Sequence, residues 1–86
     1  MARQIIIDFE PGHIHRMRNF GEKLYRTLQE HGWGSISLHE IDSATTRLRV
    51  GVFPRRSVHQ IAQMIQKLLV KHHLASIASI SEQSHS

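Results

Sequence analysis

Strand-like and helix-like hydrophobic patterns alternate along this 86-residue chain, and their order restricts the fold more than any other feature. Residues 3–9 (RQIIIDF) are rich in β-branched side chains and predict a first strand. From His13 to His31 the apolar spacing changes to three and four residues, which predicts an amphipathic helix that ends at Gly32. Gly21 lies on the apolar stripe, where glycine is about 1 kcal/mol less favourable than alanine, so it predicts a close approach of this helix to the sheet.

Two stretches of alternating polarity follow, residues 34–41 (GSISLHEI) and residues 45–53 (TTRLRVGVF). The segment between them, DSA, is short enough for a hairpin. One register brings both apolar faces to the same side of the sheet. The predicted partners are Ile36 with Val50, Leu38 with Leu48, Ser37 with Arg49 and His39 with Arg47.

A second helix begins after Ser57, because residues 57–60 (SVHQ) form a capping-box pattern. Its apolar face carries Val58, Ile61, Ala62, Ile65, Leu68 and Leu69. Lys71, His72 and His73 occupy its last turn, where cations complement the helix dipole. Residues 75–81 (ASIASIS) predict a last strand, and we expect residues 82–86 to form a flexible tail.

The resulting βαββαβ order predicts an α+β sandwich of ferredoxin-like topology. Right-handed crossovers then give a four-stranded antiparallel sheet in the order 4-1-3-2 with both helices on one face. Residues 1–81 therefore form a single domain, since a chain of this length cannot build a second core.

The composition restricts the class of protein and its partners. A domain of this size buries limited apolar surface and has no cysteine for a disulfide, which favours a homodimer. No apolar run approaches the about 20 residues needed to cross a bilayer, and the start MARQIIIDFE becomes acidic too early for a signal peptide. We therefore expect a cytoplasmic protein without membrane contact.

The predicted topology sorts the basic residues to two opposite ends of the domain. One end collects histidines, and the other collects arginines together with Trp33 and the start of the second helix. The histidines are His13, His15, His39, His72 and His73, and the arginines are Arg3, Arg55 and Arg56. Imidazoles suit zinc and related metals, but helix-end and loop histidines explain this distribution without a metal or another cofactor, so we expect neither.

The net charge of +4 leaves nucleic acid open as a partner. The helix-free face would carry Arg47 and Arg49, and Arg55 and Arg56 precede the second helix, whose backbone amides suit anions. RNA-recognition domains of this topology stack bases on aromatic residues at the centres of strands 1 and 3, where this chain has Ile6 and Arg49.

The sequence does not predict an enzyme. Asp8 has only Glu10 as a neighbouring acid for a metal-dependent nuclease, and no nucleophile triad or glycine-rich phosphate loop is present.

The stretch IIIDFEPGHIHRM, followed by a helix and then GWGSISLHEI, resembles the opening of small ACT-type regulatory domains. These domains share the βαββαβ order, often place Pro-Gly between strand 1 and helix 1, and bind small effectors such as amino acids at that turn. The resemblance implies a ligand site at Gly12, where the backbone would approach the effector, with His13 beside it. We include His15 of the same turn in the predicted ligand site.

Two hypotheses follow from these features. The first is a non-catalytic, homodimeric regulatory or protein-interaction module whose ligand or partner meets the Gly12, His13 and His15 turn or the open sheet. The alternative is a nucleic-acid-binding protein that uses Arg47, Arg49, Arg55 and Arg56.

Overall fold

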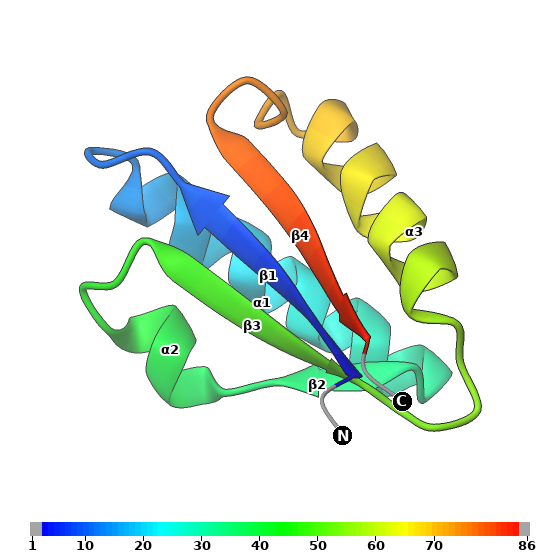
Figure 1. Ribbon diagram of the computed structural model, residues 1–86. Helices are drawn as coiled ribbons and strands as arrows, with labels where there is room; N and C mark the ends of the chain where they lie inside the picture. Colours follow the sequence, from blue (N-terminus) through cyan, green and yellow to red (C-terminus); the bar gives the residue numbers. More distant parts are fainter. Residues whose placement is uncertain (1–2, 85–86) are drawn as a thin grey trace.

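The computed structural model describes residues 3–84 and places four strands and three helices in them (Figure 1). In chain order these elements are β1 Arg3–Phe9, α1 Ile14–His31, β2 Gly34–Ile36, α2 Leu38–Asp42, β3 Arg47–Val52, α3 Val58–Lys71 and β4 Ala78–Ser84. None of the helices in this range is long and apolar enough to cross a membrane.

The strands form one antiparallel sheet in the order β2-β3-β1-β4. Read from its other edge, this is the predicted order 4-1-3-2, which is therefore confirmed. β1 lies in the centre, where all seven of its residues pair with β4 and five pair with β3. Because β2 and β4 are at the borders, each has one edge without a partner strand in the described part of the chain.

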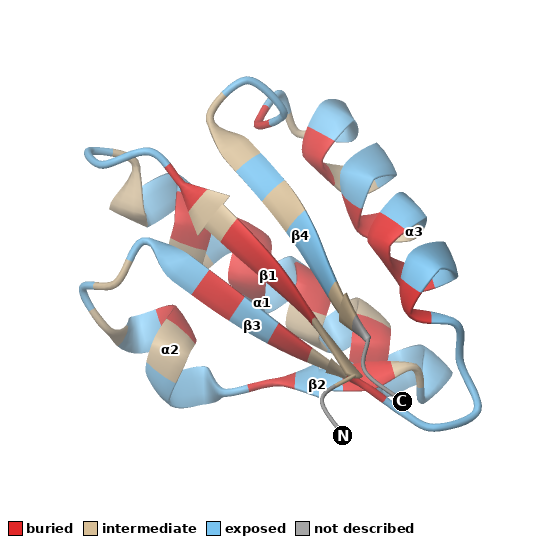
Figure 2. Ribbon diagram, viewed as in Figure 1, coloured by how far each residue is buried: buried red, intermediate tan, exposed pale blue. Residues whose placement is uncertain are grey.

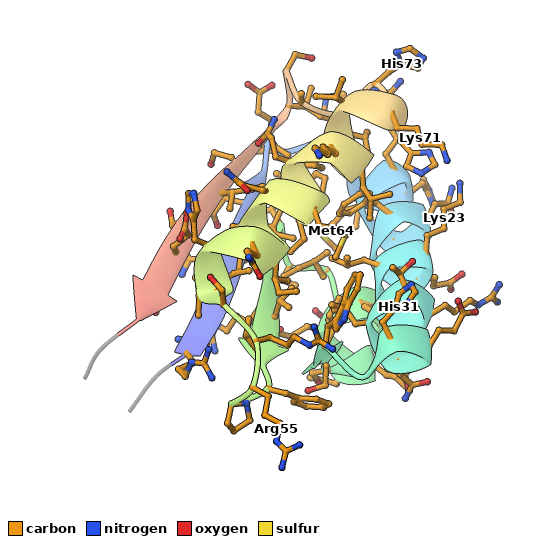
Figure 3. The ribbon with its side chains drawn as sticks, turned by 90° about the vertical axis from the view of Figure 1, so that its right-hand side faces the viewer. Lys23, His31, Arg55, Met64, Lys71 and His73 are labelled. Atoms are coloured by element: carbon orange, nitrogen blue, oxygen red, sulfur yellow. The ribbon has the colours of Figure 1, made fainter. Side chains whose placement is uncertain are left out.

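The long helices α1 and α3 pack on the same face of this sheet (Figures 1 and 3). Ile5 and Ile7 of β1 are fully buried beneath them, and the buried sides of both helices face the strands (Figure 2). At Gly21 a Cβ atom would lie 3.2 Å from Ile41 Cγ1 and 3.4 Å from Leu48 Cδ1. The predicted close approach of α1 is therefore confirmed, and it involves β3 and α2.

Strand β2 is shorter than predicted, because the chain turns into the helix α2 after Ile36. The partners Ile36 and Val50 are as predicted. Leu38 is 53% exposed in α2, so its predicted pairing with Leu48 is wrong, and so are the pairings of Ser37 with Arg49 and His39 with Arg47.

The physical reason is that α2 buries Ile41, only 1% exposed, beside Gly21 of α1, which a continued strand would not do. Helix α2 and the segment after it also supply hydrogen-bond acceptors for the edge of β3 that a longer β2 would have covered. Glu40 accepts a hydrogen bond from the Arg49 backbone N–H at 3.1 Å, and the Thr45 hydroxyl accepts one from the Arg47 N–H at 3.1 Å.

The last strand begins and ends three residues later than predicted, at Ala78 and Ser84 rather than at residues 75 and 81. After α3 the chain turns through residues 74–77, where the Ile77 N–H donates to the Leu74 carbonyl at 3.0 Å. Residues 82–84, which we expected in a tail, continue the ladder with β1. Residues 85 and 86 of the predicted tail lie outside the described residues.

Candidate functional site

The turn between β1 and α1 contains the three predicted ligand-binding residues, Gly12, His13 and His15. Gly12 has φ +92°, in the left-handed region that favours glycine, so it is needed to turn the chain. His13 precedes α1 without a capping bond from its side chain, and its carbonyl accepts from the Met17 N–H at 2.9 Å. His15 is exposed, and three hollows in the described chain are lined by other residues. The three residues thus share an exposed turn, and a ligand there stays a prediction.

Four of the five grouped histidines lie where the topology predicted them, at the end of the molecule formed by the β1–α1 turn and the end of α3 (Figure 1). These are His13, His15, His72 and His73. His39 lies in α2 instead of at the end of a strand. Among residues 3–84 no three His, Cys, Asp or Glu side chains are grouped so that they could hold a metal ion.

Arg47 and Arg49 lie on the helix-free face, and both have acidic partners. Arg47 Nε is 2.7 Å from Asp8 Oδ1 across the β1–β3 ladder, and Arg49 Nε is 3.6 Å from Glu40 Oε1. These pairs offset the positive charge of this face. Ile6 pairs with Arg49 in the centre of the sheet and is only 6% exposed, so the face offers no aromatic platform at its centre.

The opposite end of the molecule forms the arginine pole, which we define as Arg3, Trp33, Phe53, Arg55 and Arg56. The Arg3 guanidinium donates to the Phe53 carbonyl at 3.0 Å and also to the Arg56 carbonyl. These bonds tie the start of β1 to the loop before α3. Phe53 is 44% exposed and Arg55 points away from the body of the molecule (Figure 3). The predicted grouping of these arginines with Trp33 is therefore observed.

Trp33 joins this pole to the end of α1. Its ring stacks on the His31 imidazole, with centroids 4.2 Å apart and planes at 17°. The Arg56 guanidinium carbon lies 5.8 Å from the centroid of the Trp33 ring, within the range of a cation–π contact. Helix α1 ends at Gly32 with φ +66°, as predicted, and this turn brings His31 and Trp33 onto one another.

The outer edge of β4 is the longest unpaired strand edge in the described residues. The Glu10 N–H donates to the Ile77 carbonyl at 2.8 Å, and alternate residues of β4 beyond it continue the bonding to β1. The backbone groups of Ala78, Ile80 and Glu82 therefore point away from β1. No described strand pairs with this edge, and α3 lies alongside it (Figure 1).

A groove of about 240 Å³ runs beside this edge, between β4 and α3. Ala62, Gln63 and Gln66 form its helical side, and Ile80 and Glu82 form its strand side. His59 of α3 closes one part of it, since its Nδ1 lies 3.0 Å from Glu82 Oε2 and its Nε2 lies 3.1 Å from Gln63 Nε2.

A second hollow, of about 170 Å³, lies between α1 and the end of α3, and we call it the basic hollow. Arg16, Asn19, Phe20 and Lys23 of α1 line it together with His72 and Leu74. The His72 ring packs edge-on against Phe20, with centroids 6.4 Å apart. Burial lowers the pKa of His72, and the neighbouring charges of Lys23, Lys71 and His73 lower it further.

Sequence reasoning anticipated some of these features. The predicted sheet order placed the last strand at a border of the sheet, and a border strand has one edge without a partner strand. The spacing of Arg16, Asn19 and Lys23 places them on one side of α1, but only the turn after α3 reveals that His72 and Leu74 complete a hollow there. The stack of His31 on Trp33 was not predicted, because it depends on the geometry of the turn at Gly32.

Comparison of the chain with protein-family models, with curated proteins and with solved structures found no match.

Proposed function

We propose that this chain is a ferredoxin-like, non-catalytic regulatory module that works as a homodimer joined along the free edges of its two β4 strands. The observation that carries this proposal is the seven-residue β4 with one side of its backbone unpaired and a groove beside it. Such an edge is a template for another strand.

The edge of β4 lacks two of the devices by which monomeric proteins guard their sheet borders. Its sequence, ASISEQS, contains no lysine and no proline. Its only charge, Glu82, interacts with His59 of the same chain. An unguarded edge of this length is expected to be covered in the working form of the protein, and an antiparallel strand can always pair with a second copy of itself about a two-fold axis.

A two-fold axis at Ile80 gives the register that suits the side chains best. Ile80 then faces Ile80 of the partner subunit, and Ala78 faces the partner's Glu82. Each of these positions has outward-pointing backbone groups, so every such pair exchanges two hydrogen bonds. A shift of the axis to Ser81 would place the Glu82 carboxylate against Ile80, which loses the contact between apolar side chains. A shift to Ser79 would pair Ile80 with the smaller Ala78, which reduces that contact.

The groove beside β4 supports the same arrangement. Ala78, Ile80 and Glu82 point toward the α3 side of the sheet, because their β1 partners Phe9, Ile7 and Ile5 belong to the core beneath the helices. In the dimer, side chains of the incoming strand would lie over Ala62 and Gln66. A dimer formed this way leaves the turn at Gly12, His13 and His15 accessible to a small effector or a protein partner, as the resemblance to ACT-type domains implies.

The experiment measures the mass of the chain by light scattering at protein concentrations from about 5 to 500 µM. This range covers the dissociation constants expected of a small interface. The mass should rise from that of a monomer to that of a dimer. Ile80→Lys introduces the charge that guards natural edges and should hold the protein at the monomer mass. Ser79→Lys is the matched control, since it adds the same charge to the same strand on the helix-free face and should leave the dimer intact.

A cysteine variant tests the register. The chain has no cysteine, so Ile80→Cys should give a disulfide-linked dimer on mild oxidation, whereas Ser79→Cys should not. Circular dichroism checks that each variant folds. A wild-type mass that stays monomeric throughout the range would overturn the proposal, and so would equal effects of the two lysine variants.

The arginine pole favours one second function, the binding of single-stranded nucleic acid. Phe53 is exposed, Arg55 points into solvent, and Trp33 lies beside Arg56 and His31. Aromatic rings next to arginines suit stacked bases and their phosphates. Arg47 and Arg49 contribute less to this function, because Asp8 and Glu40 neutralise them.

Trp33 is the single tryptophan of the chain, so its fluorescence reports on this pole alone. If the second function holds, a single-stranded oligonucleotide should quench it, and the affinity should fall steeply with salt. Replacing Arg55 and Arg56 by glutamine should weaken binding far more than the same change at Arg47 and Arg49. Fluorescence that does not respond to the oligonucleotide at low salt would exclude this function.

A further inference from the structure

We propose that the basic hollow between α1 and the end of α3 binds the phosphate group of a small phosphomonoester. This inference goes beyond the dimer proposed above and does not depend on it, since the hollow and the edge of β4 are lined by different residues.

The side chains that line the basic hollow favour an anionic ligand. Arg16 and Lys23 bring two permanent cations to the hollow, Asn19 adds an amide and His72 an imidazole, and no acidic residue contributes to the lining. Within residues 3–84 neither Arg16 nor Lys23 forms an ion pair. This differs from Arg47 and Arg49, whose charges already have carboxylate partners. The hollow therefore holds unbalanced positive charge around donors that can converge on one group.

The size of the hollow and its apolar floor favour a small phosphomonoester as the ligand. Its volume of about 170 Å³ is below the about 300 to 1,000 Å³ of pockets that enclose a whole cofactor or drug-sized molecule. A phosphate group fits, with its ester carbon chain leaving toward solvent. Phe20 and Leu74, 2% and 4% exposed, form an apolar floor against which the first carbons of the ester can pack.

The end of α3 holds His72 in place for this role. Leu74 N–H donates to the Leu69 carbonyl at 2.8 Å and His73 N–H to the Val70 carbonyl at 3.1 Å, which closes the helix in a Schellman turn. His73 takes the left-handed position with φ +59°, unusual for a residue with a side chain. Figure 3 shows Lys23 on α1 and Lys71 and His73 at the end of α3 on the same side of the molecule.

The same cations make the site sensitive to pH. The groups that face His72 are Arg16 and Lys23 from α1 and Lys71 and His73 from its own segment, all basic, and its lowered pKa keeps it neutral at neutral pH. A bound dianion offsets these charges and stabilises the protonated imidazole, so binding should raise the pKa of His72. By linkage, the anion should bind more tightly as the pH falls and His72 gains its proton.

The test is an NMR titration of the full chain with inorganic phosphate, glycerol 3-phosphate and sulfate, each against sodium chloride at equal ionic strength. Amide signals of residues 16–23 and 72–74 should shift in a saturable way. Similar affinity for the first two anions indicates recognition of the phosphate alone, and tighter binding of the ester indicates contacts of its carbons with Phe20 and Leu74. Sulfate stays a dianion between pH 5 and pH 8, about the range in which a histidine titrates. A change in sulfate affinity over this range therefore reports the titration of His72 and not a change in the charge of the anion.

Lys23→Gln and Arg16→Gln should each weaken phosphate binding by about tenfold, the effect of losing one charged hydrogen-bond donor. Lys67→Gln is the control, because it removes the same charge from an exposed position of α3 outside the hollow and should have little effect. These substitutions are on the surface, so the fold should persist.

The proposal is overturned if the anions shift no signals beyond the chloride control, if the Lys67 variant loses as much affinity as the other two, or if sulfate leaves the pKa of His72 unchanged. Because the dimer is tested by light scattering with variants of β4, either proposal can fail alone.

Discussion

At the scale of single residues, Gly34 is the most restricted position of the sheet. It pairs with Val52 at the start of β2, and a Cβ atom there would collide with the Gly51 carbonyl oxygen. A backbone atom of a paired strand cannot move aside as a flexible side chain can. The sequence suggested a strand at this position but could not reveal the contact, which depends on how closely β2 and β3 approach.

Gly34→Ala should therefore destabilise the fold by about 1 to 3 kcal/mol, the usual cost of overpacking. Thermal unfolding followed by circular dichroism should show a fall in Tm of several degrees. Gly51→Ala is the matched control from the neighbouring strand, because its Cβ would meet nothing closer than Ser35 Oγ at 3.7 Å. Equal melting temperatures for the two variants would show that β2 and β3 do not approach one another closely enough at Gly34 to exclude a Cβ atom.

At the scale of elements, the sequence predicted the long amphipathic segments and missed the short ones. Helices α1 and α3 and strand β1 have apolar patterns long enough to identify their type. Residues 35–39 alternate in polarity like a strand, yet Ser37 and Glu40 also have the spacing of a capping box, the pattern that identified the start of α3 at Ser57. The burial of Ile41 beside Gly21 decides between the two, and that contact is between distant parts of the chain.

Helix α2 gives a testable role to Glu40, whose carboxylate replaces the missing strand partner of Arg49. Glu40→Ala removes this acceptor and should cost about 1 kcal/mol, with faster hydrogen exchange at the Arg49 amide. Glu40→Gln retains an acceptor and should preserve more of the protection. Glu22→Ala, an exposed acid of α1, is the control for the loss of charge. Unchanged exchange at Arg49 in Glu40→Ala would mean that water satisfies this amide equally well.

At the scale of the whole molecule, chain direction separates the basic residues into groups with different surroundings. The predicted arrangement placed histidines and arginines at opposite ends, and this holds for His13, His15, His72 and His73 and for Arg3, Arg55 and Arg56. The sequence could not show which charges are neutralised. Arg47 and Arg49 have acidic partners on the open face, whereas Arg16 and Lys23, which no pattern singled out, line a hollow without acids.

A dimer joined at β4 also changes how the whole molecule unfolds. If folding and association are linked, the melting temperature of the wild-type chain should rise with protein concentration, because mass action favours the associated state. The melting temperature of Ile80→Lys should not depend on concentration, and the curves of Ser79→Lys should follow the wild type. Ile80 is partly buried against the core, so its variant should also melt at a lower temperature at every concentration. The concentration dependence of the melting temperature therefore separates a loss of packing from a loss of the interface. A loss of packing lowers the melting temperature equally at every protein concentration, whereas only a loss of the interface removes its rise with concentration.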